Sequence, residues 1–108
     1  MNYDILIEVA SSNDRAASQL TKELLDTVSG IVEKSQITNQ NDSQDFGTIL
    51  AIVLGSAAIV EVAKGIADRI RRDRNSTVIL KAKNGNELEI SGVSEQAAVE
   101  ILEFLKDA

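Results

Sequence analysis

The residues best suited to bind a charged group are four arginines in the second half of the chain. They are Arg69, Arg71, Arg72 and Arg74. A basic patch of this kind attracts phosphate and carboxylate groups, which raises nucleic acid as a candidate partner. However, Asp68 and Asp73 are interleaved with the arginines, and the whole chain has only three aromatic residues to stack on bases. We therefore expect no nucleic-acid partner, and interpret the patch as a solvated helix end whose cations suit the helix dipole.

The sequence lacks the side chains that most often carry out catalysis. The chain has no cysteine and no histidine, which excludes thiolate nucleophiles and zinc–thiolate sites and removes the commonest general base. Carboxylates do occur close together, as Glu87 with Glu89 and Glu100 with Glu103. Both pairs fall on expected exposed faces, where glutamates ordinarily serve solubility. The sequence thus predicts a non-enzymatic protein with no catalytic residue and no cofactor.

A metal site is also not expected. The polar loop at 38–45 alternates Asn39, Asn41, Ser43 and Asp45, in partial likeness to a calcium-binding loop. The glycine that such a loop needs at its sixth position is absent, and Leu50 stands where the bidentate glutamate belongs. We interpret 38–45 as a solvated connection.

Length and charge bound the remaining function classes. A chain of 108 residues with an ordinary apolar fraction predicts one folded domain, 1–108. The net charge is −6, yet residues 64–83 carry seven cations and two aspartates, which leaves −11 on the rest. This asymmetry favours electrostatic docking or self-association. The first residues lack the pattern of a signal peptide, so we expect a cytoplasmic protein.

Apolar periodicity predicts the elements that position these residues. Alternation over 3–9 indicates a strand, and helical spacing over 14–29 indicates an amphipathic helix. A weak pattern at 31–37 favours a strand at a sheet edge. The remaining expected elements are a long helix at 45–74, a hairpin of two strands at 77–83 and 87–91, and a helix that Ser94 caps. The predicted fold class is α+β, a small sheet in β-α-β-α-β-β-α order with a long central apolar helix.

The hairpin has two candidate loops. A two-residue turn at Asn84-Gly85 puts the apolar faces of the strands out of phase. A three-residue loop, 84–86, instead pairs Ala82 with Leu88 and keeps the faces in phase, and we expect this second form.

The long helix is the most unusual predicted element. At 45–74 it would be roughly 45 Å long, whereas a small domain is about 30 Å across. Its N-terminal half is apolar all the way round, so it offers more apolar surface than the domain needs. The candidate interaction residues on this surface are Phe46, Gly47, Leu50, Ala51, Val53, Leu54, Gly55, Ala57 and Ala58. Two alternatives stay open: a partner binds this surface, or the helix at 14–29 covers it.

A membrane is the third alternative for the same run. Gly47, Ala51 and Gly55 have the small-residue spacing of packed transmembrane helices. The uncharged run 46–60 is 15 residues long, short of the roughly 20 that span a bilayer. Insertion of 46–60 into a membrane is therefore ranked below a protein partner.

Residues 45–105 resemble a known family in the order of their segments. An apolar run at 48–60 leads to the basic end Arg69–Arg74, then to the strand TVILKAK at 77–83, the turn NGN, the strand ELEI and an acidic helix. This order is similar to the effector-associated constant component family of bacterial conflict (immunity) systems. The resemblance implies an adaptor in antiviral defence, linked to effectors such as caspase-like or trypsin-like proteases and NTPase-regulated partners. It implies no catalytic residues.

The sequence therefore predicts a non-enzymatic adaptor or scaffold that couples or assembles such an effector through the long apolar helix. The expected partners are a protease-like protein effector, further copies of the same chain, or both.

Overall fold

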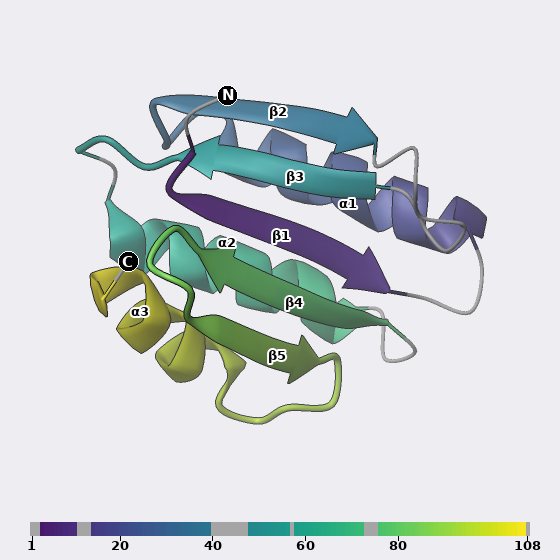
Figure 1. Ribbon diagram of the computed structural model, residues 1–108. Helices are drawn as coiled ribbons and strands as arrows, with labels where there is room; N and C mark the ends of the chain where they lie inside the picture. The colour runs from purple at the N-terminus through teal and green to yellow at the C-terminus, as the bar shows by residue number, and fades with distance from the viewer. Residues whose placement is uncertain (1–2, 11–13, 40–47, 57, 73–75, 108) are drawn as a thin grey trace.

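Strand β1 (Ile5–Ala10) is the centre of an antiparallel sheet (Figure 1). The computed structural model describes residues 3–10, 14–39, 48–56, 58–72 and 76–107. In these ranges the sheet has five strands in the order β2-β3-β1-β4-β5. The other elements are α1 (Asp14–Val28), β2 (Lys34–Asn39), β3 (Thr48–Val53), α2 (Ile59–Arg72), β4 (Thr77–Ala82), β5 (Glu87–Ser91) and α3 (Ala97–Asp107). The predicted α+β class is confirmed, and β2 lies at a sheet edge as expected.

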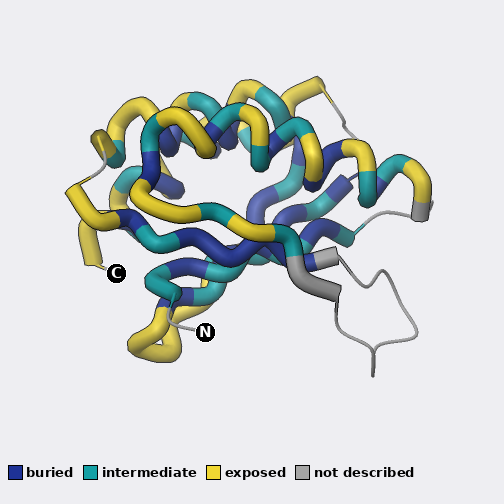
Figure 2. The backbone as a smooth tube through the Cα atoms, turned by 90° about the horizontal axis from the view of Figure 1, so that it is seen from above, coloured by how far each residue is buried: buried dark blue, intermediate teal, exposed yellow. Residues whose placement is uncertain are grey.

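All three described helices lie on one face of the sheet, and two views at right angles agree on this (Figures 1 and 2). Alternation along the strands decides which side chains meet the helices. Ile7 of β1, Leu50 of β3 and Leu80 of β4 share this face by register, and all three are completely buried. Leu24 of α1 and Ile66 of α2 cover them from the helix side. The core is accordingly aliphatic.

The predicted long helix at 45–74 is wrong in its N-terminal half. Residues 48–53 form strand β3, between β1 and the edge strand β2, and helix α2 begins only at Ile59. The fold thus has one more strand than predicted. The C-terminal half is confirmed as an amphipathic helix that buries Val62, Ile66 and Ile70. No helix in the described ranges is both long and apolar enough to cross a membrane.

The composition of β3 explains both why the sequence predicts a helix for residues 48–53 and why they form a strand. An inner strand with apolar side chains on both faces is uncharged all round, as a buried helix is, so apolar content alone does not separate the two. Leu50 and Ile52 point into the core, whereas Ile49 and Ala51 lie on the opposite face. After β3, Gly55 has φ of 59°, a left-handed conformation that stops the strand. A Cβ there would also lie 2.9 Å from Glu33 Cβ.

The hairpin keeps its apolar faces in phase, as predicted, but its loop starts one residue earlier. Leu80 pairs with Leu88 and Lys81 with Glu87, so the loop is 83–85 rather than 84–86, and Ala82 does not pair with Leu88. Gly85 supplies the reason, because it has φ of 98° at the last loop position, where a three-residue loop needs a left-handed residue.

Helices α1 and α2 are packed closely against each other at Gly65. A Cβ at residue 65 would overlap the Cγ2 methyl of Thr27 on α1. Thr27 is held in place because its Oγ1 donates to the Glu23 carbonyl at 2.8 Å and accepts from Arg69 Nε at 3.1 Å. The spacing of the two helices therefore depends on a glycine facing this threonine.

This contact predicts a change of sign in a double-mutant cycle. In a free helix, alanine is more stabilising than glycine by about 1 kcal/mol. In the wild-type background Gly65→Ala must displace Thr27, and such overpacking costs about 1–3 kcal/mol, so we expect a net loss of about 1 kcal/mol. In a Thr27→Ser background the methyl is gone and the hydroxyl stays, so we expect Gly65→Ala to gain about 1 kcal/mol. Urea unfolding followed by circular dichroism measures both, and the same sign in both backgrounds would contradict the prediction.

Candidate functional site

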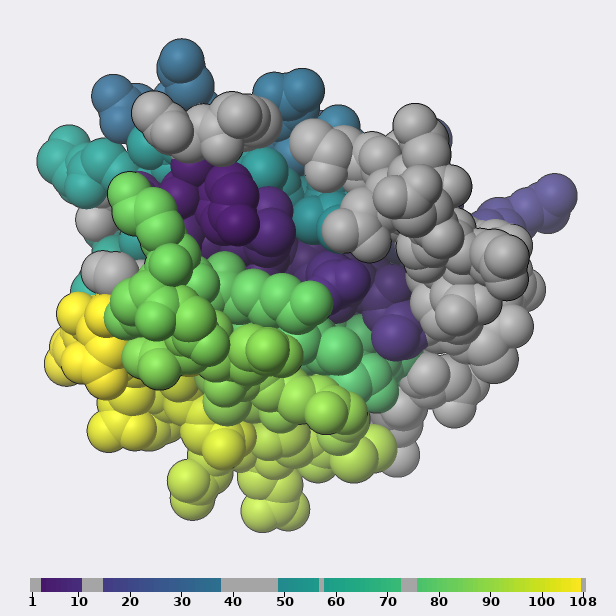
Figure 3. Space-filling view, viewed as in Figure 1, coloured from purple at the N-terminus to yellow at the C-terminus, as the bar shows by residue number. Residues whose placement is uncertain are grey.

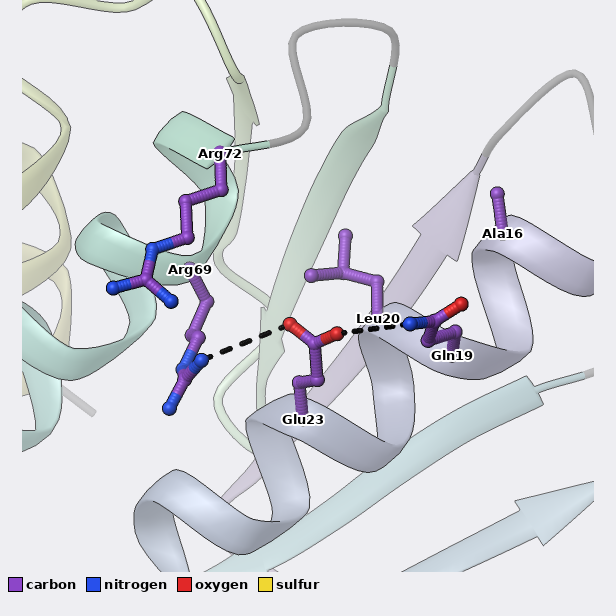
Figure 4. Close-up of a pocket in the computed structure, with 6 residues that line it drawn as sticks. All are labelled: Ala16, Gln19, Leu20, Glu23, Arg69 and Arg72. Atoms are coloured by element: carbon purple, nitrogen blue, oxygen red, sulfur yellow. Dashed lines mark hydrogen bonds and ion pairs between the residues drawn. The ribbon is translucent and has the colours of Figure 1, made fainter.

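A groove between α1 and α2 brings two of the predicted arginines together. Arg69 and Arg72 are three residues apart, so they lie on neighbouring positions of the last turn of α2. Arg69 extends toward Glu23 of α1, and the guanidinium of Arg72 lies beside Arg69 (Figure 4). The groove has a volume of about 380 Å³ and is lined by Ala16, Gln19, Leu20, Glu23, Arg69 and Arg72.

Arg69 is oriented by α1. Its Nε donates to Thr27 Oγ1 at 3.1 Å, and its Nη1 lies 3.8 Å from Glu23 Oε1. The other oxygen of that carboxylate, Oε2, accepts a hydrogen bond from Gln19 Nε2 at 3.4 Å (Figure 4). The Arg69 and Glu23 side chains are 35% and 37% exposed, so their ion pair is screened by water and contributes at most about 1 kcal/mol. The guanidinium of Arg69 is therefore held in place by α1, and it still has N–H donors without a hydrogen-bond partner among the described residues.

The other predicted arginines do not join this groove as a group. Arg71 points to the opposite side of α2, where its Nη2 donates to the Glu95 carbonyl at 3.4 Å beside a second hollow lined by Gly92, Val93 and Ser94. Arg72 is exposed, and its guanidinium has no hydrogen bond or ion pair with the part of the chain that the structure describes. Arg74 lies outside the described residues. The predicted patch is thus divided between two sides of one helix.

The predicted interaction residues do not form one surface, and their placement on a helix face is wrong. Leu50 and Leu54 belong to the core. Ala51 and Val53 lie on the sheet face away from the helices. Three predicted residues, Phe46, Gly47 and Ala57, lie outside the described residues. The other two, Gly55 and Ala58, are exposed in the connection between β3 and α2. The physical reason is the strand β3, whose alternation sends neighbouring residues to opposite faces.

The sheet face away from the helices is the second notable surface. No described helix covers it, and Figure 3 looks directly onto it, with β1 in purple between β3 and β4. By register, five apolar residues lie on this face: Leu6, Ile49, Ala51, Val53 and Ile79. Ile49 and Ala51 are buried, with 5% and 2% of their surface exposed, and the other three are half-buried. They are separate from the main core because the sheet lies between. We call these five residues the open-face cluster.

Charged residues are interspersed with the open-face cluster, because Glu8 of β1 lies between Ile49 and Ile79 by register. Lys81 of β4 forms an ion pair with Glu8, and Lys83 Nζ lies 3.9 Å from Asp4 Oδ1. The Glu8 carboxylate accepts a hydrogen bond from Lys81 and attracts its charge, which raises the pKa of the Lys81 ammonium group above its usual value. The result is a face on which aliphatic side chains and ion-paired side chains lie side by side.

Several of these residues carry no signal in the sequence alone. Glu23 and Thr27 have the pattern of ordinary helix residues, and only the packing of α1 against α2 makes them partners of Arg69. Leu6 and Ile79 alternate with the core residues of their strands, which marks them as facing away from the helices once the sheet is known.

In the described ranges no three carboxylates lie close enough together to hold a metal ion.

A scan against protein-family models finds no match, and neither do searches of curated proteins and of solved structures.

The Lys81 pair predicts a pH-dependent contribution to stability. Because the folded pKa of Lys81 is raised above the ordinary 10.5, the pair stabilises the folded state below about pH 10.5 and loses this effect as the pH rises through the folded pKa. We expect the difference in unfolding free energy between wild type and Lys81→Met to be constant from neutral pH upward and to shrink above that point. Urea unfolding at a series of pH values measures it. Lys106→Met removes an exposed lysine of α3 as the control, and an equal pH dependence in both variants would contradict the assignment.

Proposed function

We propose that this protein is a non-enzymatic adaptor that holds a protein effector on the open face of its sheet. The observation that carries the proposal is the open-face cluster, a group of aliphatic side chains interspersed with ion pairs on a face that no described helix covers. Protein interfaces that form transiently are a similar mixture of apolar and polar area.

The kind of surface points to a protein rather than a small molecule. The cluster spans three neighbouring strands, so it presents an extended sheet face. Leu6 and Ile79 are half-buried in the isolated chain and have apolar area left to lose. Aliphatic side chains without aromatic anchors suit an interface of modest affinity.

The resemblance of residues 45–105 to effector-associated constant components supports the choice of partner class. It favours a protease-like effector, caspase-like or trypsin-like, or an NTPase-regulated partner, in a bacterial immunity system. A cytoplasmic location and assembly of several copies of the chain belong to the same proposal.

The membrane alternative is the less favoured proposal. It required a helix across the apolar run 46–60, and residues 48–53 of that run are strand β3, hydrogen-bonded to β1 on one side and β2 on the other. Withdrawing β3 into a bilayer would break the sheet between these two strands. The adaptor is therefore the function that we propose.

The test places a charge in the cluster without disturbing the sheet. Ile79 lies opposite Glu8 on one side and Glu89 on the other, so a lysine at 79 would meet two carboxylates in the folded strand. We expect Ile79→Lys to weaken binding of the proposed protease-like effector by about 2 kcal/mol, on the order of thirtyfold. Isothermal titration calorimetry measures the affinity, and sedimentation of the chain alone reports self-assembly.

The matched control makes the same change on the helix layer. Val99 of α3 is 55% exposed, so Val99→Lys should bind as the wild type does. Circular dichroism establishes that both variants are folded. Wild-type affinity in a folded Ile79→Lys would rule out the open face as the docking surface.

A further inference from the structure

We infer that the groove between α1 and α2 is a second docking site, which takes an Asp or Glu side chain from an acidic segment of a partner protein. The juxtaposition that supports it is Arg69 of α2 facing Glu23 of α1, with Arg72 beside Arg69 in the lining of the same groove (Figure 4). This site is separate from the open sheet face and does not depend on the proposed function.

The groove has unused capacity for an anion. The Arg72 guanidinium has no partner among the described residues. The Nε of Arg69 donates a hydrogen bond to Thr27. Its Nη1 lies 3.8 Å from Glu23, which is longer than the about 2.7–2.9 Å of a charge-assisted hydrogen bond. Two guanidiniums of α2 therefore line the groove, and among the described lining residues they share it with a single carboxylate, that of Glu23 on α1.

That carboxylate shows which chemistry the groove accepts. Glu23 is held there by the Gln19 amide on one oxygen and faces Arg69 with the other. A carboxylate from a partner can make the same approach and also reach Arg72. Its methylene groups can lie against Ala16 and Leu20, which form the apolar part of the lining. A volume of about 380 Å³ admits a side chain and adjoining backbone.

The surface beside the groove favours a segment with more than one acidic residue. A shallow hollow of about 490 Å³ on α1 is lined by Arg15, Ser18, Gln19 and Lys22, and it shares Gln19 with the groove. Besides Arg15, the described residues that line the two hollows include three cations, Lys22, Arg69 and Arg72, and one anion, Glu23, although the whole chain carries −6. Asp26 and Asp68 are close in sequence to these residues but line neither hollow.

A nucleic acid fits these residues less well. Among the described residues no aromatic side chain lines either hollow, so bases would have nothing there to stack on.

The experiment is a fluorescence anisotropy titration with a labelled decapeptide of alternating glutamate and glycine at low salt. We expect weak binding that falls as salt rises. Arg72→Gln should weaken it about tenfold, since it removes one of the two guanidiniums that can form charge-assisted hydrogen bonds with a glutamate of the peptide. Arg71→Gln is the matched control, because it removes the neighbouring arginine that points to Glu95 instead. No binding, or equal loss in the two variants, would overturn the proposal.

A second pair of variants tests the role of Glu23. Glu23→Gln removes the carboxylate that competes for Arg69, so it should strengthen peptide binding several-fold. Glu103→Gln removes an exposed charge on α3 and should change it little. Equal effects of the two would overturn the assignment of the groove.

Two further measurements distinguish an acidic-peptide groove from a nucleic-acid site and from the open sheet face. Tighter binding of a ten-nucleotide single-stranded DNA, with displacement of the peptide, would overturn the proposal in favour of a nucleic-acid site. Ile79→Lys should leave peptide binding unchanged, so the groove and the open sheet face succeed or fail separately.

Discussion

The antiparallel pairing of β1 with β3 on one side and β4 on the other is the interaction on which the rest of the structure depends. It places three strongly apolar strands together, with Ile7, Leu50 and Leu80 in register on one face. Three helices cover that face, and each completely buried aliphatic side chain contributes about 1.5–3 kcal/mol. The same pairing also collects Leu6, Ala51 and Ile79 on the other face. The open-face cluster is thus a direct consequence of forming the core.

Packing within the helix layer determines the second surface in a similar way. Gly65 allows α1 and α2 to approach, and the threonine that occupies the space also orients Arg69 through its hydroxyl. Core geometry and groove geometry therefore share one residue, Thr27. The groove is formed by two packed helices and not by a loop, so a change in the spacing of the helices would move Arg69 relative to Glu23.

The sequence predicts those parts of the fold that have a clear period. The alternation in β1 and the helical stripes of α1 and α2 appear in the structure as expected. Strand β3 escapes prediction because a strand with two apolar faces has no alternation, and only its β-branched residues and the left-handed Gly55 mark it. The basic character of Arg69 and Arg72 is evident from the sequence, but the groove is not, because Glu23 and Thr27 reach it only through the tertiary contact of two helices.

The two surfaces have a geometric relation that matters for an adaptor. The open-face cluster lies on the sheet face away from the helices. The described residues that line the groove all belong to α1 and α2, in the helix layer on the other side. The sheet separates them, so a segment bound at one does not compete sterically with a protein bound at the other. Their chemistry also differs, because one offers aliphatic area and the other offers cations.

A partner long enough to reach both would gain from the high effective concentration of its second segment once the first is bound. Two separate partners would instead be held within one small domain, whose extents are 33 × 33 × 25 Å. Either arrangement lets weak individual contacts add up to a stable assembly, which is what surfaces without aromatic anchors require.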